Sequence, residues 1–135
     1  LHDALPIFED RSILENVMLP ALAAGASTDE ARSQALAALS RCHMSAHAHD
    51  MPIDLSSGQR QQVSLARAVV NQPVLILADE PAAHLDAHNA QMLIDLLGEF
   101  AAAGVTVIVA SHLLLAPFDV AYREIKFASN AGALP

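Results

Sequence analysis

The stretch that decides the fold is Leu55–Asp86, with the sequence LSSGQRQQVSLARAVVNQPVLILADEPAAHLD. It opens with a turn at Leu55–Gln59, and a helix is predicted from Gln59 to Val70. The turn includes three small residues, Ser56, Ser57 and Gly58. Bare backbone N–H groups at a helix start carry partial positive charge and suit a phosphate group. The stretch therefore begins with a candidate phosphate-binding turn.

A short apolar run, Val74–Ala78, follows this helix and ends at Asp79 and Glu80. A run of this length and character fits a strand covered on both faces of a parallel sheet. Open α/β sheets bind their ligands at the carboxyl ends of the strands. Mg²⁺ prefers hard oxygen ligands, and a carboxylate can act as the base for an attacking water molecule. We therefore expect Asp79 and Glu80 to lie at a ligand-binding edge.

A second buried strand is predicted over Val105–Ala110, after a helix that extends from Asp86 to about Ala103. The helix carries an apolar stripe at spacings of three and four: Met92, Leu93, Leu96, Leu97 and Phe100. Strand, helix and strand in this order predict a right-handed parallel crossover. The second strand ends at Ser111 and His112. A further strand, Val120–Phe127, and a terminal turn, Ser129–Pro135, are also predicted.

Two helix starts in the N-terminal half carry a serine followed three residues later by a glutamate, the pattern of a capping box. The pairs are Ser12 with Glu15 and Ser27 with Glu30. Pro20 is expected to interrupt the first helix, and Gly25 to end that segment.

Three histidines, His43, His47 and His49, follow the second of these helices. They indicate either a metal cluster or a solvated loop. We favour the loop, because only Asp50 and Cys42 are nearby to complete a metal site.

The composition excludes several classes of protein. The chain has 135 residues, of which 53% are hydrophobic and 16% charged, so it has enough apolar residues for a core and is not of a disordered type. A formal net charge of −8 argues against nucleic acid as a partner. Cys42 is the only cysteine, so an intrachain disulfide is impossible. No apolar run approaches the roughly 20 residues of a membrane span, and no signal peptide is evident.

Three motifs in the first stretch together resemble those of the ATP-binding cassette (ABC) ATPases. Leu55–Gln59 is similar to their LSGGQ signature, Val74–Glu80 to their Walker B strand, and Ala83–Asp86 to their D-loop. Order and spacing agree with the family. The resemblance implies an α/β fold: an incomplete P-loop NTPase (ABC ATPase) fold, with a helical subdomain plus the C-terminal half of a mostly parallel catalytic sheet.

The resemblance also divides the chain. Residues 8–70 correspond to the helical subdomain with its signature helix, and residues 71–135 to the Walker B, D-loop and H-loop part of the catalytic core. No Walker A motif, G-x-x-x-x-G-K-[ST], and no Q-loop glutamine are found in the sequence. We therefore expect an N-terminally truncated fragment that is inactive alone. Residues 1–7 can be back-translated to a common sequencing-adapter end, and we expect them to be non-native.

The family's cofactors are ATP and Mg²⁺, and its catalytic roles carry over to matching positions. Asp79 would hold Mg²⁺, through water. Glu80 would polarise the attacking water, and His112, at the H-loop position, would orient the γ-phosphate. Phosphoryl transfer of this kind depends on positioning and charge stabilisation.

The remaining roles belong to a shared active site. The signature residues Ser56, Ser57, Gly58 and Gln59 would close on ATP held by a second copy in a head-to-tail dimer. Asp86 would couple the two sites. The sequence departs from the family at three positions: Ser57 replaces a glycine, Ala82 a threonine, and Leu113 an aspartate. Of these, Ser57 is expected to weaken dimer closure, because it adds a Cβ where backbone approaches phosphate.

Within the family, three short stretches resemble the cell-division ATPases of the FtsE type: ARAVVNQP, LADEP and the N-terminal segment FEDRS…ENV. The resemblance implies an FtsX-like transmembrane partner and a peripheral position on the inner face of the bacterial plasma membrane. ENVMLPALAAG also resembles lipoprotein-releasing and macrolide-exporter ATPases. A third alternative is an interaction fragment that hydrolyses nothing, because Walker A is absent.

Overall fold

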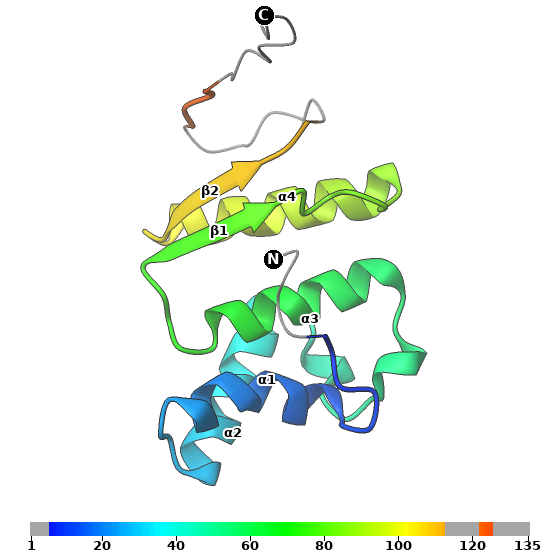
Figure 1. The fold of residues 1–135 in the computed structure, drawn as a ribbon, viewed down its shortest axis with the longest axis vertical. Coiled ribbons are helices and arrows are strands. Elements are labelled where there is room, and N and C mark those ends of the chain that lie inside the picture. Colours follow the sequence, from blue (N-terminus) through cyan, green and yellow to red (C-terminus); the bar gives the residue numbers. More distant parts are fainter. Residues whose placement is uncertain (1–5, 113–121, 126–135) are drawn as a thin grey trace, which may run out of the picture.

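The computed structural model describes residues 6–112 and 122–125. Figure 1 shows two layers, one made of helices and the other made of strands with a helix beside them. The helical layer contains α1 (Ile13–Ala23), α2 (Thr28–Arg41) and α3 (Ser57–Val69), together with the short 3-10 turns η1 (Ser45–His47) and η2 (Pro52–Asp54). The second layer contains β1 (Leu75–Asp79), α4 (Ala87–Ala102) and β2 (Thr106–Ala110).

Both predicted capping boxes are confirmed. At the start of α1, the Glu15 N–H donates to Ser12 Oγ at 3.3 Å, and Glu15 Oε2 accepts from the Ser12 N–H at 2.8 Å. Ser27 and Glu30 repeat this arrangement at the start of α2, with the same two distances. The hydrogen bonds from these serines lower the pKa of both glutamates. Each cap therefore keeps a negative charge at the positive end of its helix.

The prediction that Pro20 interrupts the first helix is wrong, because α1 continues through Pro20 to Ala23. A proline removes one N–H donor but keeps its carbonyl. The Pro20 carbonyl accepts from the Ala24 N–H at 3.0 Å and from Asn71 Nδ2 at 3.2 Å. Ala21, the next residue, is fully buried. Packing and these two bonds hold the last turn, and Gly25, at φ +95°, ends the segment as predicted.

The core lies between the three helices of the first layer and continues under β1 to α4. Ile13, Val17, Leu39, Val63 and Leu97 are among its fully buried members. Cys42 is also fully buried, and burial raises the pKa of its thiol to about 12, so the thiol stays protonated and unreactive.

The two strands pair in parallel, as predicted, with Leu75 opposite Thr106 and Asp79 opposite Ala110. Within residues 6–112, only one face of this pair is covered. Leu77 is 60% exposed and Ile108 is 54% exposed, while Ile76 is buried. Figure 1 shows α4 along one face of the pair, and within residues 6–112 nothing buries the other face.

The α4 stripe is confirmed except at Met92, which is 38% exposed, whereas Ile94 is buried in its place. Gly104, at φ +93°, ends this helix region. The described residues 122–125 form no strand, so the prediction of Val120–Phe127 as a strand is wrong for those four residues; its other residues, and the turn Ser129–Pro135, lie outside the described part. Among the described residues, no helix has the length and apolar character needed to cross a membrane.

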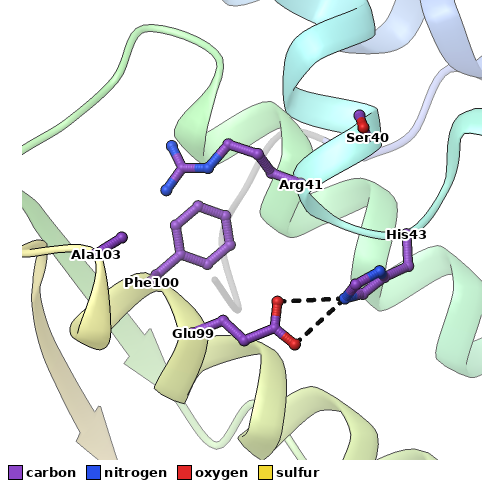
Figure 2. A pocket seen from close by; sticks show the side chains of 6 residues that line it. All are labelled: Ser40, Arg41, His43, Glu99, Phe100 and Ala103. Carbon is purple, nitrogen blue, oxygen red and sulfur yellow. Dashed lines mark hydrogen bonds and ion pairs between the residues drawn. The ribbon is translucent and has the colours of Figure 1, made fainter.

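The end of α2 contacts α4 at a shallow pocket with a volume of about 180 Å³. Figure 2 shows the Arg41 guanidinium over the Phe100 ring, 4.3 Å from its centroid. Beside it, His43 Nε2 lies 3.3 Å from Glu99 Oε2. His43 has a positive φ of 57°, which is uncommon for a residue with a side chain. These two contacts join the helical layer to α4.

The Ser27 cap generates a test of stability. We expect Ser27→Ala to lower the free energy of unfolding by about 1 kcal/mol, because the first turn of α2 loses its side-chain acceptor. Urea denaturation of the full-length protein measures this. Ser33→Ala, at an exposed position of the same helix, is the control and should be neutral or slightly stabilising. Equal effects of the two substitutions would contradict the role of the cap.

Candidate functional site

The ends of the two strands bring Glu80 and His112 together. Glu80 Oε1 lies 2.6 Å from His112 Nδ1 and accepts from the His112 backbone N–H at 2.7 Å. The second carboxylate oxygen, Oε2, accepts from the Ser111 hydroxyl at 3.3 Å. The Glu80 side chain is 25% exposed and the His112 side chain is 75% exposed. The two predicted catalytic residues therefore form one hydrogen-bonded group at the carboxyl edge of the sheet.

The backbone of Glu80 has a positive φ of 45°, which is uncommon for a residue with a side chain. Its N–H donates to the Ala110 carbonyl at 2.8 Å, which continues the pairing of the strands one residue beyond β1. This conformation aims the carboxylate at the residues that follow β2. Backbone strain of this kind persists where surrounding contacts hold it, and it is frequent at functional sites.

The hydrogen bond from the His112 side chain is the largest influence that lowers the pKa of Glu80. The carboxylate is therefore ionised at neutral pH. A lowered carboxyl pKa means that this group's contribution to stability is present above its ordinary pKa of 4.5 and is lost as the pH falls through the folded value.

The signature turn starts α3 with a third capping box, which the sequence reasoning missed. Ser56 Oγ accepts from the Gln59 N–H at 3.2 Å, and Gln59 Oε1 accepts from the Ser56 N–H at 2.8 Å. The pattern of a serine followed three residues later by a glutamine was a sufficient signal. Unlike Glu15 and Glu30, Gln59 adds no negative charge, so the positive end of α3 is not neutralised.

Ser57 and Gly58 differ in what surrounds them. Ser57 is exposed and is the first residue of α3, so its Cβ fits without strain in this subunit. Gly58 is buried, and a Cβ there would clash with the side chain of Asn89. The position that needs a glycine for packing within the subunit is therefore 58.

Asp86 caps α4 and is tied to the same asparagine. Asp86 Oδ1 accepts from the Asn89 N–H at 2.9 Å, and Oδ2 accepts from Asn89 Nδ2 at 2.5 Å. The backbone hydrogen bond from Asn89 is the main cause of the lowered pKa of Asp86. Because Asn89 also lies against Gly58, it joins the start of α4 to the start of α3. Figure 1 shows these two helix starts on the same side of the molecule.

The predicted site residues thus form two groups. Glu80 and His112 lie at the carboxyl edge of the sheet, with the exposed Asp79 at the end of β1. The signature turn and Asp86 lie at the starts of α3 and α4. Leu113 lies outside the described residues, and Ala82 is buried.

A family model described as "ABC transporter" matches residues 2–83. The chain belongs to the ABC transporter family. The chain is 44% identical over 103 residues to the "Cell division ATP-binding protein FtsE" of Escherichia coli (strain K12), a match that covers 76% of this chain and 46% of the relative. It is 42% identical over 115 residues to the "Lipoprotein-releasing system ATP-binding protein LolD" of Bacteroides fragilis, covering 82% of this chain and 50% of the relative.

The fold is similar to solved ABC cassettes. One is described as "Dimeric structure of a post-hydrolysis state of the ATP-binding cassette MJ0796 bound to ADP and Pi"; its TM-score is 0.67 at 34% identity, and the match covers 82% of this chain and 50% of that one. The chain spans about half the length of the relatives it matches. The predicted fold, a partial α/β fold of the ABC ATPase type, is therefore confirmed.

Among the histidines, the described residues include no group of three or more His, Cys, Asp or Glu side chains placed to hold a metal ion. His43 pairs with Glu99, and His47 with Asp50 at 2.7 Å. The sequence reasoning gave no role to Ser111 or Asn89, and it interpreted His47 as part of a solvated loop. Asp86 is itself an N-cap signal, and the backbone N–H that it accepts from is that of the third residue after it, Asn89. The contacts of Ser111 and His47 depend on tertiary structure.

The Glu80–His112 contact generates a prediction on protonation. We expect His112→Ala to raise the pKa of Glu80 toward its ordinary value of 4.5, because the largest influence that lowers it is removed. Titration of the Glu80 side-chain carboxyl carbon by NMR in the full-length protein measures the change. His88→Ala, at an exposed position near the start of α4, should leave the Glu80 pKa unchanged. An unaltered Glu80 titration in His112→Ala would contradict the contact.

Proposed function

We propose that the full-length protein is the ATP-binding and ATP-hydrolysing subunit of a bacterial ABC-type membrane complex of the FtsE type, coupling hydrolysis to a membrane partner in cell division. The observation that supports hydrolysis most directly is the 2.6 Å contact between His112 Nδ1 and Glu80 Oε1. It holds an ionised carboxylate at the edge of the sheet where α/β folds bind ligands.

Glu80 would polarise the attacking water. Oε1 contacts both the backbone N–H and the Nδ1 atom of His112. Within the described residues, Oε2 accepts one longer hydrogen bond, from the Ser111 hydroxyl. Oε2 is therefore the oxygen with room to accept a hydrogen bond from water. A carboxylate with a lowered pKa is a weak base. The main role of Glu80 would therefore be to orient the water, and removal of the proton from the water would come late in the reaction. This suits a reaction governed by positioning and electrostatics.

Asp79 would hold Mg²⁺ through a water molecule. It is an exposed carboxylate at the end of β1, one residue before Glu80. Mg²⁺ commonly keeps several waters and binds one or two protein carboxylates together with substrate phosphates, so one aspartate here fits the ion. Bound there, the ion would neutralise charge on the phosphates, while His112 would orient the γ-phosphate.

The active site would be shared by two copies of the protein. Ser56, Ser57, Gly58 and Gln59 would close on ATP held by the second copy, and Asp86 would couple the two sites. The uncharged cap at the start of α3 supports anion binding. The dimeric state described for the similar cassette MJ0796, bound to ADP and Pi, supports the dimer.

The membrane partner would be an FtsX-like transmembrane subunit, with the ATPase peripheral on the cytoplasmic face of the plasma membrane. The similarity to FtsE supports this choice. The comparable similarity to LolD favours one alternative, a lipoprotein-releasing ATPase. The same catalytic residues would serve either role, because the difference lies in the partner.

Replacing the proposed water-polarising group tests hydrolysis. We expect Glu80→Gln in the full-length protein to lower ATP turnover by about a hundredfold or more while MgATP still binds, because an amide does not replace the carboxylate. Phosphate release and nucleotide binding are measured separately. Glu99→Gln, which alters a carboxylate in α4 that pairs with His43, is the control and should keep turnover. Full turnover in Glu80→Gln would refute the assigned role.

Depletion of the protein in its own host separates the two candidate partners. We expect cells that fail to divide and form filaments, with lipoproteins correctly sorted, because the proposed partner acts in division. Microscopy and fractionation of lipoproteins between the membranes measure the two phenotypes. Restoring the wild-type gene is the control. Lipoproteins retained in the inner membrane of dividing cells would favour the lipoprotein-releasing role instead.

A further inference from the structure

The loop before the signature turn brings one histidine against the signature glutamine. His47, at the end of η1, has its Nε2 atom 3.1 Å from Gln59 Nε2. Its other ring nitrogen, Nδ1, lies 2.7 Å from Asp50 Oδ2. The His47 side chain is 34% exposed and the Asp50 side chain is 41% exposed. A row of hydrogen bonds therefore leads from Asp50 through His47 and Gln59 to Ser56.

The direction of each hydrogen bond in this row follows from its last member. The backbone N–H of Ser56 can only donate, so the atom of Gln59 that faces it is the carbonyl oxygen, at 2.8 Å. The opposite end of the Gln59 amide is then the NH₂ group, which donates to His47. His47 Nε2 must accept, so Nδ1 carries the proton and donates it to Asp50. One tautomer of His47 fits this geometry.

The loop that carries His47 and Asp50 is held by the start of α1. The Ile13 N–H donates to the Asp50 carbonyl at 3.0 Å, and the Leu14 N–H donates to the Ala48 carbonyl at 2.8 Å. The Asp50 N–H donates back to the His47 carbonyl at 3.1 Å. The loop is therefore anchored to a helix that belongs to the core, and the imidazole is presented to Gln59 from a fixed support.

We propose that His47 is a positioning residue for the signature turn, an inference that rests on the proposed function because the turn would close on ATP. With Nε2 as an acceptor, His47 holds the Gln59 amide in the orientation that caps Ser56. If the amide turned over, its NH₂ group would face the Ser56 N–H, two donors would oppose each other, and half of the capping box would be lost. The loop histidine thereby fixes the backbone that presents Ser57 and Gly58 to phosphate.

The tautomer gives a test that needs neither ATP nor a substitution. Long-range ¹H–¹⁵N NMR correlations are recorded on the full-length protein in mildly alkaline solution, where imidazole rings are neutral. The proposal requires His47 to carry its proton on Nδ1. A proton on Nε2 would overturn it, whether or not the protein hydrolyses ATP. Conversely, an Nδ1 proton in a protein without ATPase activity would defeat the proposed function and leave the hydrogen-bonded row intact.

Substitution of His47 tests its effect on the nucleotide. His47→Leu removes the acceptor, and we expect the KM for ATP to rise about fivefold, the effect of one neutral hydrogen bond on an equilibrium constant. The kcat should be unchanged, because Glu80 and His112 are untouched. His47→Gln, whose side-chain oxygen reaches the position of Nε2, should restore the KM.

His49→Leu is the matched control, since His49 is an exposed residue of the same loop. It should leave the KM for ATP at the wild-type value. A KM unaffected by His47→Leu, an equal rise in His49→Leu, or a failure of His47→Gln to restore the KM would each overturn the positioning role.

Discussion

The parallel pairing of β1 with β2 is the constraint on which the site depends. Asp79 lies opposite Ala110, so the residues that follow each strand emerge at the same edge. The Glu80 N–H extends the ladder by one bond to Ala110, and the positive φ of Glu80 then turns its carboxylate toward His112. A shift of the register by one residue would separate these groups and move the apolar side chains of the strand to the opposite face.

Among the residues that the structure describes, α4 is the helix that supports this pairing. Helix α4 lies along one face of the strands, and its buried stripe includes Leu93, Leu97 and Phe100. The starts of α4 and α3 meet at Asn89. Its side chain lies against Gly58, and its backbone N–H and Nδ2 donate to the Asp86 carboxylate, which orients it. The sheet edge and the signature turn are therefore linked through α4, although their polar groups form separate hydrogen-bonded clusters. A movement of α4 would therefore displace both the sheet edge and the signature turn.

The three capping boxes have the same geometry but differ in the charge that they place at the helix start. Ser12 and Ser27 are paired with glutamates whose lowered pKa values keep charge at the helix start. Ser56 is paired with a neutral glutamine. A carboxylate at position 59 would oppose a phosphate near the turn, because both carry negative charge. A neutral glutamine at position 59 has one disadvantage. The two ends of its amide differ, so a rotation of the amide by 180° would lose the capping bond, whereas a carboxylate has two equivalent oxygens. A neighbouring acceptor is therefore needed to hold the amide in one orientation. His47 occupies that place.

The sequence by itself determined the starts of α1 and α2, the order of strand, helix and strand, and the residues at the strand ends, because capping and periodicity act over a few residues. The same local signals led to errors at Pro20 and Met92. Tertiary structure alone decided those points, since packing compensates for a missing N–H and neighbouring elements determine which apolar face is covered. It also decided the contacts of His47 with Gln59 and of Glu80 with His112, because partners 12 and 32 positions apart meet only when helices and strands pack.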